Sequence, residues 1–325
     1  MTDENNGPST QGWDTYWQGA VAGDALQSGG FQHPAFAAIW QDAISEFLTA
    51  HASDESRFLD IGTGAGAVIE ALSKVSGAKL ENVSCVDVSA AAIDAVKNRF
   101  SAITGIVADA GAIPLESESY DLITSQFGIE YAGPTAIDEA ARLLATNGSL
   151  LFFMHIQQGS LYNESCAALD ALQRTRQCDF IGLTRRFFEA GFAAARGTDR
   201  APYEAAAGAM NPAIQEIEAI LTEHGEHVAS DTIVTLYNTV QTIHGRIQHY
   251  NPEEVLDWLN NIEREIGKHE ERMTSMRDAA LDEAAFKSIC ERLVEHGLKI
   301  NRAQPSLVEG ETLPIAWVLQ ASREP

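Results

Sequence analysis

The chain has 325 residues, and its formal net charge is −24 at pH 7. This length suits one large domain or two modest ones. So acidic a surface repels phosphodiester backbones and anionic lipids, and we therefore expect neither a nucleic acid nor a membrane as partner.

Three general features of the sequence indicate the cellular compartment of the protein. The four cysteines are widely spaced without a C-x-x-C pair, which indicates reduced thiols and no metal site. The first twelve residues are polar and lack the basic and apolar parts of a signal peptide. No run approaches the ~20 apolar residues that span a bilayer. We therefore expect a cytoplasmic protein.

Residues 1–34 form an N-terminal segment with the aromatic-rich stretch WDTYW. Trp13, Tyr16 and Trp17 in this stretch are candidates for a lid over a ligand site. The same side chains would also serve as a staple that buries the segment, and the two interpretations are compatible.

Residues 35–159 alternate between predicted strands and predicted helices. The strands are the apolar stretches RFLDIG, NVSCVDVS, ITGIVADA, YDLITSQFG and GSLLFFMH. The segments between the strands are predicted to be mainly helical. This alternation is typical of a parallel sheet covered by helices on both faces.

Residues 160–285 contain no convincing strand and predict helices, one of which begins at Asn211-Pro212. From Val255 to Ala280 apolar residues recur every four and three positions, a heptad seam that includes His269. Packing within a helical bundle explains this seam, and so does a coiled coil between two copies. We expect a helical insertion that serves as a substrate cap or for dimerisation, in a monomer or a homodimer.

Residues 286–325 predict a helix and then two strands, GLKINRAQPSL and LPIAWVLQAS, which form an antiparallel hairpin. The sequence therefore predicts an α/β fold. It has a doubly wound, mostly parallel, Rossmann-like sheet of seven strands that ends in this hairpin, with the α-helical insertion before it.

A glycine-rich turn follows the first predicted strand. Gly62, Gly64 and Gly66 permit a tight turn and let a ligand contact the backbone next to a helix N-terminus. A dinucleotide fingerprint requires a further small residue one place later, which Ala67 satisfies only in part. Asp60, just before the turn, suits a ligand with an ammonium or sulfonium group better than a pyrophosphate.

Two more acids, Asp87 and Asp109, follow the second and third strands. The carboxyl ends of such strands meet at one edge of the sheet, and a carboxylate after the second accepts hydrogen bonds from ribose hydroxyls. Three acidic strand ends favour a cationic adenosine ligand over NAD, so a dehydrogenase is the runner-up. Asp109 by itself is equally well explained as a turn cap.

The stretches FLDIGTGAG, CVDVS, ADAGAIPL and YDLITSQFGIEYA resemble, in this order, the motifs of class I S-adenosylmethionine-dependent methyltransferases, with a core similar to types 11 and 25. The resemblance covers roughly residues 35–160 and 285–321, and leaves out the insertion. It implies S-adenosylmethionine as cofactor and S-adenosylhomocysteine as product. The implied cofactor-binding residues are Asp60, Gly62, Thr63, Gly64, Gly66, Asp87, Val88, Asp109, Ala110, Ser125, Gln126 and Phe127.

The resemblance also implies roles. The glycine turn would hold the methionine part of the cofactor, with Asp60 beside its amino group. Asp87 would bind the ribose hydroxyls and Val88 would lie against the adenine. Asp109 and the backbone of Ala110 would take the adenine amino group.

Methyl transfer from a sulfonium is an in-line displacement, in which the protein positions the acceptor and excludes water. A base is needed only if the acceptor arrives protonated. His155, after the fifth strand, is the candidate base, and a structural histidine bonded to a loop is the alternative. Glu130 and Tyr131, after the fourth strand, are candidates to orient the acceptor.

Methyl transfer to a small-molecule acceptor is the leading hypothesis. A non-catalytic binding or regulatory protein with the same fold and a methyltransferase of protein side chains stay open. The arginine-rich stretch 174–200 is either a helix face paired with nearby acids or a site for an acidic group of the acceptor.

Overall fold

The computed structural model describes residues 34–50, 55–75, 79–308 and 312–325. The lid candidates Trp13, Tyr16 and Trp17 lie outside the described residues. The chain divides into two compact units. Unit 1 comprises the described residues up to Tyr162 and those from Asp278 onward, and unit 2 comprises Asn163–Arg277.

Unit 1 contains a sheet of seven strands in the order β3-β2-β1-β4-β5-β7-β6. The first five strands are parallel, and β7 is antiparallel to both β5 and β6. The strands are β1 (Phe58–Ile61), β2 (Val83–Asp87), β3 (Thr104–Val107), β4 (Tyr120–Gln126), β5 (Leu144–Met154), β6 (Leu298–Ser306) and β7 (Ala316–Arg323). The predicted fold, including the closing hairpin, is confirmed.

Helices cover both faces of the sheet because its central strands are buried on both sides. On one face α2 (Pro34–Ala50), α3 (Ala67–Ser73) and α4 (Ala90–Arg99) share a core cluster with strand residues such as Phe153. On the other face α5 (Pro134–Leu143) and α11 (Glu283–Glu295) pack on a second cluster that includes Phe152. Adjacent residues of β5 thus face opposite layers.

Short 3₁₀ helices complete the path of the chain. They are η1 (Leu80–Asn82), η2 (Ile129–Ala132) and η3 (Ile247–His249). Of these, η2 matters most for the site, because it directly follows the carboxyl end of β4.

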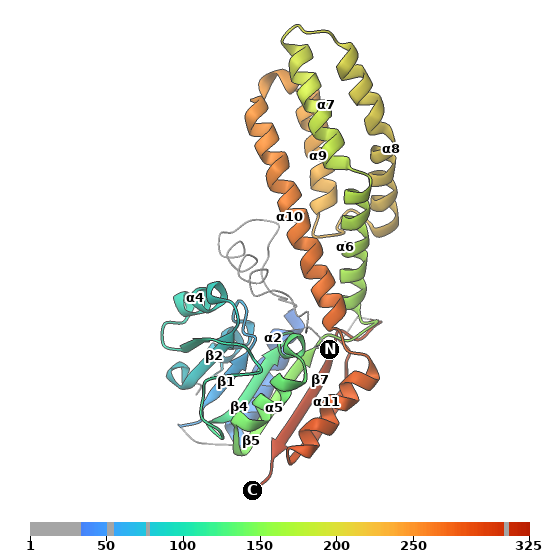
Figure 1. Ribbon diagram of the computed structural model, residues 1–325. Coiled ribbons are helices and arrows are strands. Elements are labelled where there is room, and N and C mark those ends of the chain that lie inside the picture. Colours follow the sequence, from blue (N-terminus) through green and yellow to red (C-terminus); the bar gives the residue numbers. More distant parts are fainter. Residues whose placement is uncertain (1–33, 51–54, 76–78, 309–311) are drawn as a thin grey trace, which may run out of the picture. The chain divides into compact units, whose positions relative to one another are not determined.

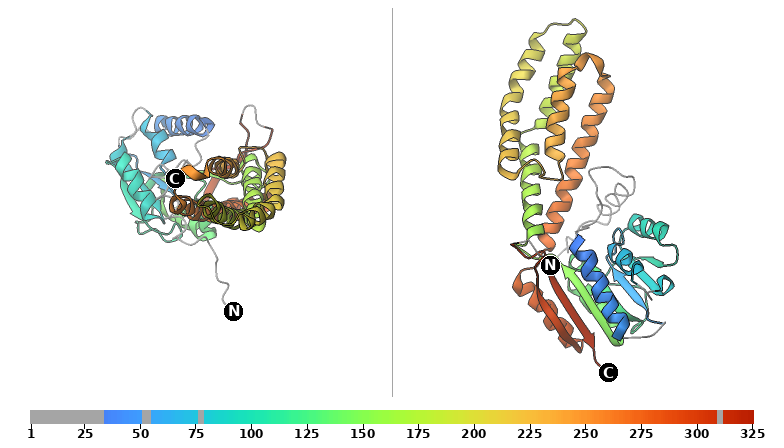
Figure 2. Two further views of the ribbon diagram at one scale, coloured as in Figure 1. Left: turned by 90° about the horizontal axis from the view of Figure 1, so that it is seen from above. Right: turned by 180° about the vertical axis from the view of Figure 1, so that it is seen from behind.

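Unit 2 is built from long helices that run alongside one another (Figures 1 and 2). These helices are α6 (Ser160–Gln177), α7 (Phe180–Ala195), α8 (Ala201–His224), α9 (Thr232–Gly245) and α10 (Pro252–Ala279), the first and last of which continue into unit 1. Val255, Leu259, Ile262, Ile266 and His269 are buried along α10. The heptad seam therefore buries side chains within this chain, as expected of a helical bundle.

The predicted helix start at Asn211-Pro212 is wrong. The helix α8 already begins at Ala201, and Pro212 lies inside it. Proline removes one hydrogen bond from a helix interior and clashes with the preceding turn. Buried Met210, Ala213 and Ile217 lie on both sides of the proline, and this packing explains why the helix continues.

Candidate functional site

The turn between β1 and α3 is shaped by its glycines. Gly62, Gly64 and Gly66 have φ values of 66°, 49° and 78°, which residues with a Cβ rarely adopt. The N–H groups of Gly62 and Thr63 both donate to Val86 O, at 2.8 and 3.1 Å, which fastens the turn to β2. A Cβ on Gly62 would lie 2.8 Å from the Cα of Gly128, so this turn closely approaches the segment after β4.

Asp60 is buried in front of this turn, near the end of β1. The hydroxyl of Thr124 donates to its Oδ1 at 2.8 Å. The pKa of Asp60 is raised to about 7, mainly by burial and also by the nearby charge of Asp87, against the opposing effect of the Thr63 and Thr124 hydroxyls. A carboxyl in this state favours a cationic partner that would stabilise its charged form.

Asp87, the last residue of β2, is also buried. Its Oδ2 accepts the N–H of Gly64 and its Oδ1 accepts that of Ser89, each at 2.9 Å. The same carboxylate therefore joins the glycine turn to the start of α4. Each oxygen has further lone pairs for ribose hydroxyls, and partly buried Val88 follows directly.

Asp109 lies beyond β3 and is exposed. Its Oδ1 accepts the N–H of Gly111 at 2.7 Å, which makes it the turn cap that the sequence allowed as an alternative. The structure leaves room for the adenine role in addition, because the remaining carboxylate oxygen is not committed to this turn. The roles of Asp109 and Ala110 toward adenine stay predictions.

Three further cofactor-binding residues that the resemblance implies, at and just after the end of β4, differ in their surroundings. Ser125 is fully buried, donates to Ile61 O at 2.7 Å and accepts the N–H of Ile129 at 3.0 Å. Gln126 accepts the indole N–H of Trp40 at 2.5 Å. Phe127 has a left-handed φ of 54°, an uncommon conformation that concentrates at functional sites. The side chain of Ser125 thus holds the strand ends together, and a role in binding stays a prediction.

Glu130, Tyr131 and His155 lie together. Glu130 and Tyr131 belong to η2, and His155 follows β5, the strand next to β4. The Glu130 Oε1 atom lies 2.8 Å from the Nδ1 of His155 and also accepts the backbone N–H of His155 at 2.9 Å. The ring of Tyr131 is perpendicular to that of His155, with centroids 5.8 Å apart. The sequence predicted each residue but not the Glu130–His155 contact.

Comparison with known proteins identifies the domain to which this site belongs. Residues 59–152 match a family described as a methyltransferase domain. This match begins in β1 and ends in β5, and it includes the glycine turn, Asp60 and Asp87. Residues 59–152 therefore form a methyltransferase domain, of the kind that takes its methyl group from S-adenosylmethionine.

Curated relatives resemble this methyltransferase domain over part of their length. An uncharacterised methyltransferase of Schizosaccharomyces pombe is 30% identical over 130 residues, which are 39% of this chain and 51% of the relative. The ubiquinone/menaquinone biosynthesis C-methyltransferase UbiE of Dinoroseobacter shibae is 29% identical over 134 residues, 39% of this chain and 50% of the relative. The chain spans about half the length of the curated relatives it matches. A solved structure, the plantazolicin methyltransferase BpumL with S-adenosylhomocysteine, is 10% identical, covers 97% of this chain and 94% of that one, and has a TM-score of 0.47.

Two buried carboxylates of the methyltransferase domain are acceptors of the kind that this cofactor needs. Backbone at Gly62 and Gly64 is free of side chains, and the carboxylates of Asp60 and Asp87 suit an ammonium group and ribose hydroxyls. Sequence reasoning missed Gly128, whose close approach to Gly62 positions this turn. The signal was present in the quoted stretch YDLITSQFGIEYA, where Gly128 follows directly on the predicted site residues.

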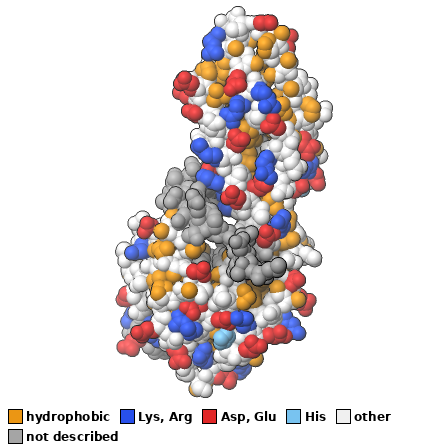
Figure 3. All heavy atoms as spheres, viewed as in Figure 1, with side chains coloured by type: hydrophobic (Ala, Val, Ile, Leu, Met, Phe, Trp, Pro, Cys, Tyr) orange, Lys and Arg blue, Asp and Glu red, His pale blue; other side chains and the backbone are white. Residues whose placement is uncertain are grey.

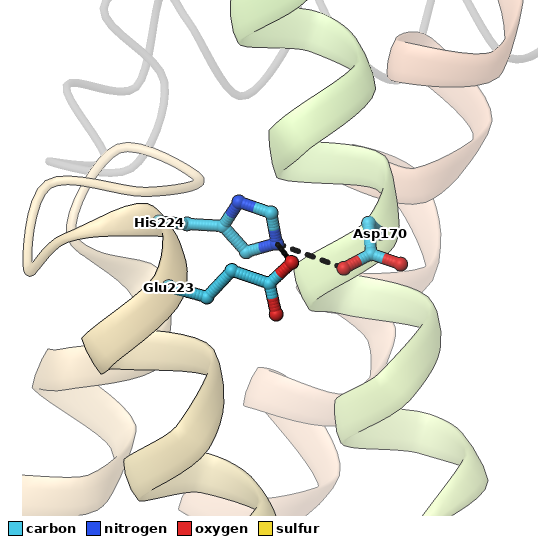
Figure 4. A group of neighbouring side chains, drawn as sticks. All are labelled: Asp170, Glu223 and His224. Carbon is cyan, nitrogen blue, oxygen red and sulfur yellow. Dashed lines mark hydrogen bonds and ion pairs between the residues drawn. The ribbon is translucent and has the colours of Figure 1, made fainter.

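A group of potential metal ligands lies in unit 2, namely Asp170, Glu223 and His224 (Figure 4). Arg174 donates to Asp170 at 3.0 Å and to Glu223 at 2.7 Å, so a guanidinium already pairs with both carboxylates of this group. His224 lies 2.8 Å from Asp170. These contacts describe an ion-pair network that joins α6 to α8.

Most arginines of the stretch 174–200 have partners within unit 2. Arg176 pairs with Glu270, Arg185 with Glu263 and Arg186 with Asp179. Lys and Arg side chains are interspersed with Asp and Glu on the face shown in Figure 3. These pairs match the interpretation of a helix face paired with nearby acids.

In the part of the chain that the structure describes, none of the helices combines the length and the apolar character of a membrane span.

Proposed function

We propose that this chain is an S-adenosylmethionine-dependent methyltransferase that acts on a small-molecule acceptor. The observation that carries the proposal is the turn Gly62–Gly66, held against β2 with Asp60 and Asp87 buried beside it. Its backbone would hold the methionine part of the cofactor, Asp60 its ammonium group and Asp87 its ribose. When bound, the cofactor supplies an activated methyl group.

Two observations support a small-molecule acceptor. The relatives called UbiE are named for ubiquinone and menaquinone biosynthesis, whose products are small molecules. The net charge of −24 repels nucleic acids, so the acceptor is not expected to be one. We retain a role of unit 2 in acceptor binding or dimerisation as a prediction.

Calorimetry with S-adenosylhomocysteine tests the proposal. We expect binding to the wild type and at least ten-fold weaker binding to Asp87→Ala, which loses both backbone hydrogen bonds and the ribose contact. Asp94→Ala is the matched control, because Asp94 is exposed on α4. Absence of binding to the wild type, or equal binding by both variants, would contradict the proposal.

A further inference from the structure

In the pair of Glu130 and His155, the carboxylate contacts one ring nitrogen of the histidine, as in a general base whose other ring nitrogen accepts a proton. Glu130 Oε1 already accepts the backbone N–H of His155, so it acts toward the ring as an acceptor as well. In the neutral ring this contact places the proton on Nδ1 and the lone pair on Nε2. Among the described residues, Nε2 has no hydrogen-bond partner.

The second oxygen of Glu130 is unusual. The side chain of Glu130 is fully buried, and its Oε2 has no hydrogen-bond partner in the described part of the chain. Leaving a buried carboxylate oxygen without a donor is costly, and such groups in native proteins normally have a partner. A ligand that brings a donor would complete this site, whereas a purely structural role for the pair leaves Oε2 unexplained.

The pair also lies close to where the cofactor is expected. Glu130 follows Gly128 by two residues, and Gly128 is the residue that Gly62 of the cofactor turn approaches. Ser125 links the end of β1 to the start of η2 by its two hydrogen bonds. The ring of Phe127 packs against that of His155, with the two ring centroids 4.4 Å apart.

We propose that Glu130 and His155 activate the methyl acceptor by removing the proton of a hydroxyl group, so that the acceptor is an alcohol or a phenol. This inference rests on the proposed methyl transfer. An aromatic amine has a free lone pair near neutral pH and a thiol ionises near neutral pH, so neither needs a preset base. A hydroxyl stays protonated near neutral pH and is a poor nucleophile in that form, so it gains most from one.

The acceptor hydroxyl gives its proton to Nε2 of His155, and its oxygen forms a bond to the methyl carbon. The bond between that carbon and sulfur breaks, and its electron pair stays on sulfur. The products are a methyl ether, S-adenosylhomocysteine and an imidazolium, which Glu130 stabilises at Nδ1 until the proton leaves to water. His155 is thus the catalytic residue and Glu130 a positioning residue.

Nitrogen NMR of the chain labelled with ¹⁵N-histidine, with S-adenosylhomocysteine bound at pH 8, tests the fixed proton state without any acceptor. His155→Asn assigns the signals. We expect a protonated Nδ1 and an unprotonated Nε2 in the wild type, and loss of this single form in Glu130→Gln. Glu118→Gln, which changes an exposed glutamate, is expected to leave it unchanged. A protonated Nε2 in the wild type would overturn the proposal.

Three probes of one shape test the acceptor class: 2-naphthol, 2-naphthylamine and 2-naphthalenethiol, each with tritiated S-adenosylmethionine. We expect transfer to the oxygen of the naphthol, about a hundred-fold less in His155→Asn and at least ten-fold less in Glu130→Gln. His296→Asn, which removes a partly exposed histidine, is expected to match the wild type. No transfer to the naphthol, transfer to its ring carbon, or equal activity of His155→Asn would overturn the proposal.

Different results would contradict the proposed methyl transfer and the proposed role of His155. If S-adenosylhomocysteine does not bind at all, the proposed function fails. If it binds but His155 carries its proton on Nε2, only the assignment of the base and of the hydroxyl acceptor fails.

Discussion

Gly62 and Gly128 approach each other so closely that neither has room for a side chain. A Cβ on Gly62 would lie 2.8 Å from the Cα of Gly128, and a Cβ on Gly128 would lie 2.9 Å from the Cα of Gly62. The contact joins the turn after β1 to the segment after β4. It brings the predicted cofactor turn next to the pair of Glu130 and His155.

Gly62→Ala should therefore lower both stability and cofactor affinity. The new methyl group meets backbone that cannot move aside, and the φ of 66° adds strain. We expect a loss of about 2–4 kcal/mol in the free energy of unfolding, measured by urea denaturation. Gly297→Ala is the control, because its φ is 78° but nothing lies within 4 Å of its Cβ. Equal losses in both variants would show that the contact with Gly128 contributes nothing.

Asp60 should make the stability of the ligand-free protein depend on pH. Burial raises the pKa of Asp60 to about 7 from 3.8, so between these values the folded chain keeps a proton that the unfolded chain has released. The free energy of unfolding should thus fall as pH rises from about 4 to about 7, relative to Asp60→Asn. Parallel pH profiles of the two proteins in thermal denaturation would contradict this.

The same carboxyl should couple cofactor binding to proton release. An ammonium group beside Asp60 favours its ionised form, so binding at pH 6 should release a proton and weaken as pH falls below about 7. Calorimetry with S-adenosylhomocysteine in two buffers of different ionisation enthalpy measures this release. Asp94→Asn should behave like the wild type, and Asp60→Asn should release no proton.

His269 should make the folded chain less stable in acid. Burial lowers the pKa of His269 to about 4, the charge of Arg272 adds to the effect, and Glu265 opposes it. Below pH 6.5 the unfolded chain binds a proton that the folded chain excludes, so the free energy of unfolding falls as pH falls toward about 4. From pH 7.5 to 5 we expect a loss of about 2 kcal/mol that His269→Leu does not share. His249→Leu, at an exposed position, is the control in urea denaturation at both pH values.

Arg174 should stabilise unit 2 without any metal ion. It donates to Glu216 and Glu223 at 2.7 Å and to Asp170 at 3.0 Å. Arg174→Ala should lower the free energy of unfolding by about 1–2 kcal/mol, because it leaves three carboxylates without their shared cation. Arg196→Ala, at an exposed position, should have little effect. A rise in the Tm of the wild type with zinc, reversed by EDTA, would instead indicate a metal site.

Hydrophobic patterning predicted the sheet correctly but did not place every helix boundary. Continuous apolar runs indicate strands buried on both faces, and their alternation with helices predicts a parallel sheet. The strand order came from the structure. The helix start predicted at Asn211-Pro212 is wrong because Pro212 lies inside α8. The buried side chains of Met210 and Ala213, on both sides of the proline, stabilise the continuous helix. Burial against neighbouring helices outweighs a single lost hydrogen bond.

For the candidate site, too, the sequence predicted some features and only the structure showed others. Spacing alone brought Asp60, Asp87 and the glycine turn to one edge of the sheet, because parallel strands end together. Spacing did not distinguish a turn cap from a ligand contact at Asp109, because that depends on which N–H groups lie within reach. The bond from Gly111 shows that Asp109 caps this turn, and its role toward adenine stays a prediction.

The sequence by itself determined the fold of unit 1, the cofactor class and the residue types at the strand ends, since these follow from periodicity and from the chemistry of short motifs. The tertiary structure decided which side chains meet. It placed Gly62 against Gly128, paired the arginines of 174–200 with acids, and joined Glu130 to His155 across 25 residues. Such contacts depend on the register of neighbouring strands and on the path of the chain beyond them, which no local pattern in the sequence records.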